Sequence, residues 1–234
     1  MDMVCGVDGC RGGWVVVTRD LDSDEVSWRL CRTAGEIVHG EVLPRVVAID
    51  IPIGLPEAGP RQCDLQARRL LGRVRGCSVF PAPIRPVLAA ANYKDACQIW
   101  FGVEGKKMSK QGFAIMPKII EVDALLQQEA PLRDIFREVH PELCFCLMAG
   151  QQPIVEGKRT DAGMKIRYGL LEPSFGRWLP HALMDRRKMQ CEEDDILDAF
   201  AALWTAERIA KGVSQTVPAV PPRDSFGLRM EMVT

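Results

Sequence analysis

The chain has 234 residues, which is enough for one domain with a full hydrophobic core and room for an inserted lobe. Its 47% hydrophobic and 26% charged residues are ordinary for a globular protein. The formal net charge of -1 excludes a wholly basic nucleic-acid coat protein, so any nucleic-acid contact must come from a local patch.

Short apolar and β-branched runs predict strands at residues 3–7, 14–18, 25–32, 45–53 and 132–140, with an edge strand at 227–233. Other stretches predict helices at 33–41, 61–75, 87–100, from Pro117 onward, at 180–189 and at 192–210. Three antiparallel strands followed by alternating helices and strands predict an α/β domain with a mixed sheet. The whole chain, 1–234, is expected to be one domain with a helical insertion at about 78–131. Glycines and lysines at 102–112 predict a mobile loop of the insertion beside a substrate cleft.

The nine cysteines and three histidines are spaced too irregularly for a disulfide framework or a structural zinc site. Reduced thiols in a chain of this size predict a cytoplasmic protein. The start of the chain lacks a basic region followed by a long apolar segment, and no run is long enough to span a bilayer. We therefore expect no signal peptide and no membrane partner.

Four short acidic motifs stand where predicted elements end: GVDG at 6–9, AIDIP at 48–52, REVHPE at 137–142 and DDILDA at 194–199. The first three interrupt apolar or β-branched runs, where an unpaired carboxylate is costly. Carboxylates gathered from separate elements hold hard divalent cations, and a two-metal site drives phosphoryl chemistry. Asp8, Asp50 and Glu138 fall at the carboxyl ends of predicted strands, where active sites of open α/β sheets collect. The pattern predicts a phosphodiesterase that depends on Mg²⁺ or Mn²⁺.

The acids near the strands also have structural interpretations. Asp8 is typical of an Asp-Gly hairpin turn, and Asp50 could pair with an arginine of the 61–75 helix. Glu138 and His140 share one side of the predicted strand, where His140 is a ligand, a proton carrier or a satisfied structural residue. These alternatives stay open at the level of the sequence.

The last predicted helix carries the other acids. Asp195 and Asp198 are three residues apart and therefore share a helix face, which small residues continue as if the helix lay close to another element. Asp194 and its preceding acids are explained by the helix dipole. Lys158 and Arg159 could bind phosphate, although loop residues of this kind are usually solvated.

Five motifs in one order resemble those of a known family: GVDGxxxGW at 6–14, IDIPIGL at 49–55, SVFPAP at 78–83, PKIIEVD at 117–123 and EVHPE at 138–142. It is an uncharacterised bacterial and archaeal family of unknown function, described as predicted RNase-H-like nucleases. The resemblance covers nearly the whole chain. It implies an RNase-H-like fold, in which helices flank a mixed five-stranded sheet.

Within the wider RNase-H-like superfamily, the last helix is also similar to that of Holliday-junction resolvases. Those enzymes carry an acid on the first strand, another at the end of the fourth, and an acidic pair ahead of an alanine in the last helix. The residues that fit these places, and that the resemblance implies as metal ligands, are Asp8, Asp50, Asp195 and Asp198. The resolvases commonly have glutamate at the second place, so the shorter Asp50 would shift the metal.

The sequence therefore predicts a nuclease or related phosphodiesterase whose catalytic residues are Asp8, Asp50, Glu138, Asp195 and Asp198. The partner is expected to be DNA, RNA or a nucleotide-like phosphodiester, and a homodimer is left open. Two other functions are also left open. The glycine-rich segment that begins at Asp8 faintly resembles the first phosphate loop of ATP-dependent phosphotransferases of the actin-like and sugar-kinase group. A non-catalytic binding module could also keep the same scaffold.

Overall fold

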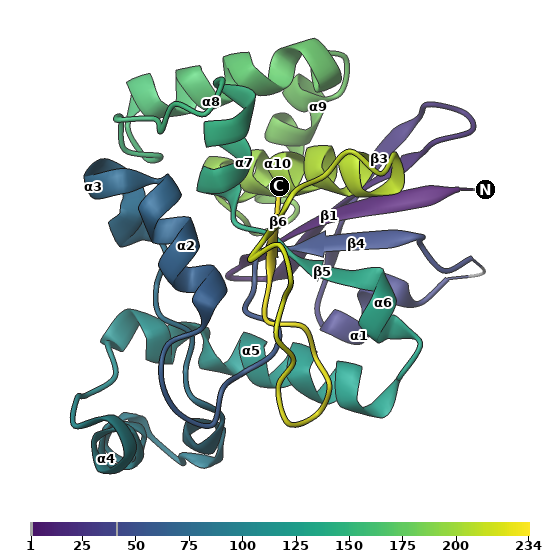
Figure 1. The fold of residues 1–234 in the computed structure, drawn as a ribbon. Coiled ribbons are helices and arrows are strands. Elements are labelled where there is room, and N and C mark those ends of the chain that lie inside the picture. The colour runs from purple at the N-terminus through teal and green to yellow at the C-terminus, as the bar shows by residue number, and fades with distance from the viewer. Residues whose placement is uncertain (1, 41) are drawn as a thin grey trace.

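The structure, a computed structural model, describes residues 2–40 and 42–234. Its centre is a five-stranded sheet with the order β3-β2-β1-β4-β5 (Figure 1). The strands are β1 (Met3–Cys10), β2 (Gly13–Asp20), β3 (Val26–Cys31), β4 (Val46–Ile49) and β5 (Phe136–Glu138). β1 and β3 both pair antiparallel with β2, whereas β4 pairs parallel with β1 and with β5. The predicted α/β fold class, a mixed five-stranded sheet flanked by helices, is confirmed.

One face of the sheet is covered by helices from the second half of the chain: α7 (Pro141–Met148), α8 (Asp161–Phe175), α9 (Leu179–Met184) and α10 (Glu193–Ala210), with the short turn η3 (Asp185–Arg187). Because side chains alternate along a strand, Val4 and Ala48 point into this core, where they pack with Phe200 and Leu203. Asp8 has the same parity as Val4 and therefore faces α10.

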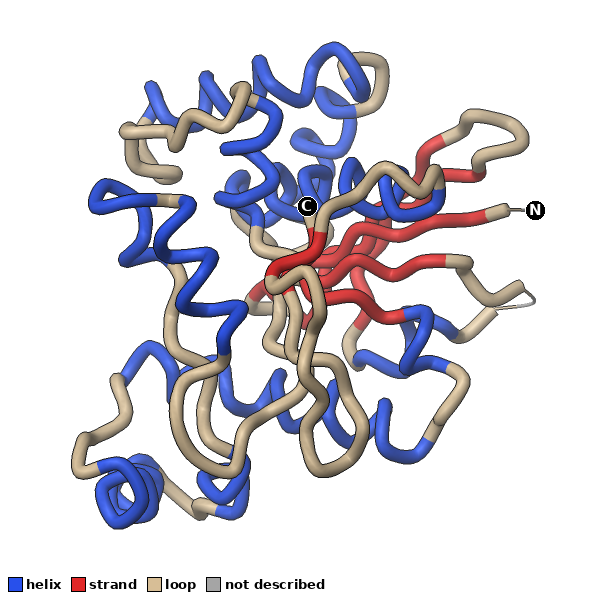
Figure 2. Tube along the Cα trace, in the orientation of Figure 1, coloured by secondary structure: helices blue, strands red, loops and turns tan. Residues whose placement is uncertain are grey.

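The opposite face packs against α1 (Ala34–Val38), α5 (Lys110–Gln128) and α6 (Leu132–Ile135). Val7 and Ile49 from the sheet join Ile119 and Val122 of α5 in this second core. The other helical segments before α5 are α2 (Gln62–Leu70), α3 (Gly72–Arg75), η1 (Gly76–Ser78), η2 (Arg85–Ala89) and α4 (Tyr93–Glu104). Figure 2 shows that long loops join these helices at the side of the sheet where β1, β4 and β5 end.

β1 and α10 lie in backbone contact. A Cβ atom at Gly6 would lie 2.0 Å from the backbone nitrogen of Leu203 and 2.3 Å from the carbonyl oxygen of Ala199. Only glycine lets two backbones approach this closely. Gly6 is two residues from Asp8, and Ala199 is next to Asp198. The backbone contact therefore brings these two acids to the same region.

The boundaries of several elements differ from the sequence prediction. Residues 132–135 form α6 and only Phe136–Glu138 form a strand, because Leu132, Ile135 and Phe136 have the i, i+3, i+4 spacing of a helical turn. Pro117 lies inside α5, which begins at Lys110 after the Ser109 cap, since the flanking apolar residues are buried against the cores.

Segments expected to be loops or turns also form helices. His140 precedes α7, which begins at Pro141, and α8 arises in a stretch for which no helix was predicted. The predicted edge strand at 227–233 is reduced to β7 (Met232–Val233), which pairs with β6 (Thr216–Val217) in a separate two-stranded sheet.

The nine cysteines are all free, and all except Cys77 are buried. Within the described residues, no helix combines the length and the apolar character needed to cross a membrane.

Candidate active site

Asp8 and Asp50 lie on neighbouring strands, on the face of the sheet that α10 covers. Asp8 belongs to β1 and is paired with Val15 of β2, so it is a strand residue and not part of a hairpin turn. Asp50 directly follows β4, and its backbone N–H donates to the carbonyl oxygen of Val7 at 3.0 Å. Only 6% of Asp8 is exposed, which makes an unneutralised charge costly there.

The start of α10 contributes two more carboxylates. Asp195 accepts a hydrogen bond from the backbone N–H of Glu192 at 2.9 Å and completes a capping box. Asp198 follows one turn later and is only 2% exposed. A pocket of about 480 Å³ is lined by all four predicted metal ligands, Asp8, Asp50, Asp195 and Asp198. The structure therefore brings these four residues together, and it gives Asp195 a structural role as well.

Lys158 places a positive charge among these carboxylates. Its ammonium donates to Oδ2 of Asp198 at 2.6 Å and lies 3.3 Å from Oδ2 of Asp194. Its side chain is 39% exposed, so the stem reaches the cluster from the surface. Of the two interpretations of Lys158, the solvated loop lysine is wrong, because this ion pair holds its ammonium in the pocket.

The loop that carries Lys158 is fixed to the helices on the other side of the pocket. Arg75, the last residue of α3, donates to the carbonyl oxygen of Ile154 at 2.6 Å and to that of Val155 at 2.9 Å, and it also binds the carbonyl of Glu156. These bonds join α3 to the segment just before Lys158. The position of the lysine is therefore set by two parts of the fold.

Burial and mutual repulsion act on the carboxylates together. The pKa of Asp8 is raised well above its ordinary value by burial and by the charges of Asp198 and Asp50. Burial also raises the pKa of Asp50, and it raises the pKa of Asp198 to about 6 although the Lys158 ammonium opposes the shift. One ammonium therefore neutralises this cluster only in part.

The donor set suits a hard divalent cation. Carboxylate oxygens are the ligands that Mg²⁺ and Mn²⁺ prefer, and Oδ1 of Asp198 is buried with no hydrogen-bond partner among the described residues. In the side-chain arrangement of residues 2–40 and 42–234, however, no three His, Cys, Asp or Glu residues are set to hold one ion. Lys158 instead occupies the second oxygen of Asp198. The four aspartates fit a divalent cation in chemistry and charge, but the ammonium of Lys158 now lies where such a cation would bind.

A family model described as a protein of unknown function, DUF429, matches residues 6–223. The chain belongs to the DUF429 family. Comparisons with curated proteins and with solved structures gave no match. The matched region contains the four carboxylates and Lys158, so the whole cluster lies within the DUF429 segment.

Glu138 does not join the cluster of four aspartates in the pocket. It is paired with Ile49 in the sheet and therefore points to the face opposite Asp50. There the guanidinium of Arg61 binds both of its carboxylate oxygens at 2.7 Å, and the backbone N–H of Ile53 donates to it at 2.6 Å. Arg61 also binds Asp64. Glu138 borders the pocket, but Arg61 already binds both of its oxygens, and burial raises the pKa of this carboxyl to about 7 although Arg61 opposes the shift.

The two other polar residues of the EVHPE motif also have protein partners. The Nε2 atom of His140 lies 3.3 Å from the carbonyl oxygen of Ser78, and its buried Nδ1 has no partner within the described part of the chain. Glu142 binds Arg167 through both oxygens, at 2.7 and 2.8 Å. His140 thus keeps one ring nitrogen available at the pocket wall, whereas Glu142 is neutralised.

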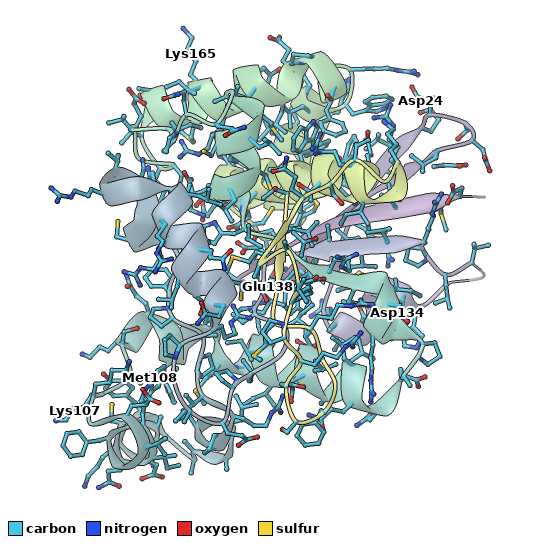
Figure 3. The ribbon with its side chains drawn as sticks, in the orientation of Figure 1. Asp24, Lys107, Met108, Asp134, Glu138 and Lys165 are labelled. Carbon is cyan, nitrogen blue, oxygen red and sulfur yellow. The ribbon has the colours of Figure 1, made fainter. Side chains whose placement is uncertain are left out.

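The lysine-rich loop at 102–112 supplies none of the described residues that line the pocket. Figure 3 places Lys107 at the outer edge of the molecule beside α4, far from Glu138 near its centre. The segment expected to be an insertion instead reaches the pocket through Phe80 and, on α5, Lys118. Lys118 belongs to the PKIIEVD motif, so this motif could have identified it as a residue of the site.

Proposed function

We propose that this DUF429 protein is a metal-dependent phosphodiesterase, a nuclease of the RNase-H-like type. One observation carries the proposal: acids from three separate elements, the buried Asp8 and Asp198 and the half-buried Asp50, line one pocket, and the ammonium of Lys158 binds Asp198 there. The positions of these acids on β1, after β4 and on α10 support the resemblance to resolvases. The free cysteines support a cytoplasmic location.

In the proposed reaction, a water oxygen bonds to phosphorus, a phosphorus–oxygen ester bond breaks, and the leaving oxygen takes up a proton to become an alcohol. Asp8, Asp50 and Asp198 would hold Mg²⁺ or Mn²⁺, with Asp195 beside them. A divalent ion there supplies a hydroxide-like nucleophile and neutralises charge on the phosphate.

Two lysines of the chain would balance the charge of the substrate. Lys158 lies among the acids, and Lys118 lines the same pocket, where its ammonium donates to the carbonyl of Gly13 and lies 4.2 Å from the centroid of the Trp14 ring. Positive groups on the walls of a pocket attract a phosphodiester that the carboxylates alone would repel. The lysines would therefore bind and orient the phosphate.

The test is a panel of single-stranded, duplex, RNA–DNA hybrid and branched oligonucleotides with Mn²⁺. We expect wild type to cleave at least one of them and Asp198→Asn to cleave none. Asp24→Asn is the matched control, because the Asp24 side chain is 70% exposed and its backbone φ of 65° is one that asparagine tolerates. Inertness of every substrate with all three proteins would contradict the proposal.

A further inference from the structure

Two of the carboxylates that line the small pocket are almost wholly covered by protein. Asp8 is 6% exposed and Asp198 is 2% exposed, and the pocket volume is about 480 Å³. Pockets that hold one small ligand have volumes of roughly 300–1,000 Å³. The site is therefore sized for a single small unit of a substrate.

A double helix is too wide to enter this pocket. Its major groove alone is about 12 Å wide, whereas the pocket has a volume of about 480 Å³ and covers the carboxylate of Asp198 almost wholly. Enzymes that act on one base in a closed pocket take single-stranded substrate or extrude one nucleotide from the stack, and the same limit of size applies to this pocket. The burial of the acids thus selects against a phosphodiester in the interior of a duplex.

Apolar side chains also line the pocket. They include Ile51, Val79, Phe80, Ile115 and Met232. Phe80 is 40% exposed and belongs to none of the hydrophobic clusters that the described residues form. Its ring is therefore available for a ligand, and an aromatic ring beside a phosphate site is a surface on which an unpaired base stacks.

We propose that the pocket takes one unpaired nucleotide, with its base on Phe80 and its phosphodiester toward Asp8 and Asp198. This inference rests on the proposed function and narrows its substrate to unpaired nucleotides. The same chemistry comes from two sources, a free dinucleotide or the end of a single strand, and both fit the volume. The proposal excludes cleavage within an intact duplex.

The test measures binding to the full chain in the presence of Mg²⁺ with two probes that contain the fluorescent base 2-aminopurine and phosphorothioate linkages, which resist hydrolysis. One is a dinucleotide, and the other is a single-stranded decamer with the probe at its end. A covalently closed circular duplex serves as competitor. Phe80→Ala should weaken probe binding at least about tenfold, the loss expected for one stacked base, and Phe80→Trp should restore it. Phe101→Ala is the matched control, since this phenyl group is 56% exposed on α4.

Tighter binding of the dinucleotide would identify a free small molecule as the source, and tighter binding of the decamer would identify a strand end. Equal losses for Phe80→Ala and Phe101→Ala, effective competition by the circular duplex, or no binding of either probe would overturn the inference. Cleavage of duplex that ignores Phe80→Ala would overturn it and leave the proposed function standing. Dinucleotide binding that depends on Phe80, without hydrolysis in Mn²⁺, would support the nucleotide-binding inference and contradict the proposed phosphodiesterase function.

Discussion

Asp198→Asn should stabilise the metal-free protein above pH 6, although it removes an ion pair. Burial raises the pKa of Asp198 from 3.8 to about 6, so its contribution to stability is fully present below pH 3.8 and is lost as the pH rises through 6. At 1.36 kcal/mol per pH unit, this difference corresponds to about 3 kcal/mol. This value already includes the opposing charge and hydrogen bond of Lys158. A net gain of about 3 kcal/mol raises the melting temperature of a chain of this size by about 6–12 °C.

Denaturant unfolding and thermal melts in EDTA measure this effect. The asparagine variant should be more stable than wild type at pH 8, and the difference should shrink toward zero at pH 4, where Asp198 is protonated in the folded protein. If Asp198→Asn loses the same stability at both pH values, its pair with Lys158 is net stabilising and the repulsion argument is refuted.

Added Mn²⁺ tests whether Asp198 is a metal ligand or only a buried acid. A cation that binds only the folded protein stabilises it by about 2.7 kcal/mol at a concentration of 100 Kd. We expect this gain for wild type and little of it for Asp198→Asn. Equal Mn²⁺-induced shifts in the melting temperature would mean that Asp198 does not bind the ion, and the nuclease proposal would lose its main support.

Three other substitutions test the ion pairs and the backbone contact that position the site. Lys158→Met removes the ammonium from Asp198 and should tighten Mn²⁺ binding about tenfold in calorimetric titration while lowering the melting temperature of the metal-free protein; unchanged affinity would show that lysine and cation do not compete. Arg61→Met leaves buried carboxylates unpaired and should cost about 3–5 kcal/mol in denaturant unfolding, so a loss below about 1 kcal/mol would contradict its role. Gly6→Ala sets a methyl group against the backbone of Leu203 and should cost more than about 4 kcal/mol or prevent folding; near-native stability would show that α10 can move away.

Much of the fold follows from local patterns. The β-branched runs around Val7, Val16 and Ile49 predict buried strands, and the caps and apolar spacing of residues 192–210 predict α10 almost to its ends. The position of acids at strand ends predicts the grouping of Asp8 with Asp50, and the resemblance to resolvases adds Asp198. Strand parity and helix periodicity are properties that a single sequence carries.

The partners of the acids could not be predicted in the same way. Lys158 lies in a loop without periodicity, and its place depends on Arg75, which is more than 80 residues away in the chain. Glu138 was assigned to the site because it ends a strand, but the register against Ile49 sets it on the other face. Such pairings depend on tertiary distances, and local patterns do not encode them.

The backbone contact at Gly6 also limits how the site can adapt to different ions. Gly6 is two residues from Asp8, and Ala199, whose carbonyl it touches, is adjacent to Asp198. The main chains that carry the two carboxylates therefore cannot widen or narrow their spacing freely. Mg²⁺ needs oxygen ligands at about 2.0–2.1 Å, whereas Ca²⁺ takes them at about 2.3–2.6 Å in looser geometry. Gly6, which fixes the spacing of Asp8 and Asp198, would therefore help the site to discriminate between ions of different radius.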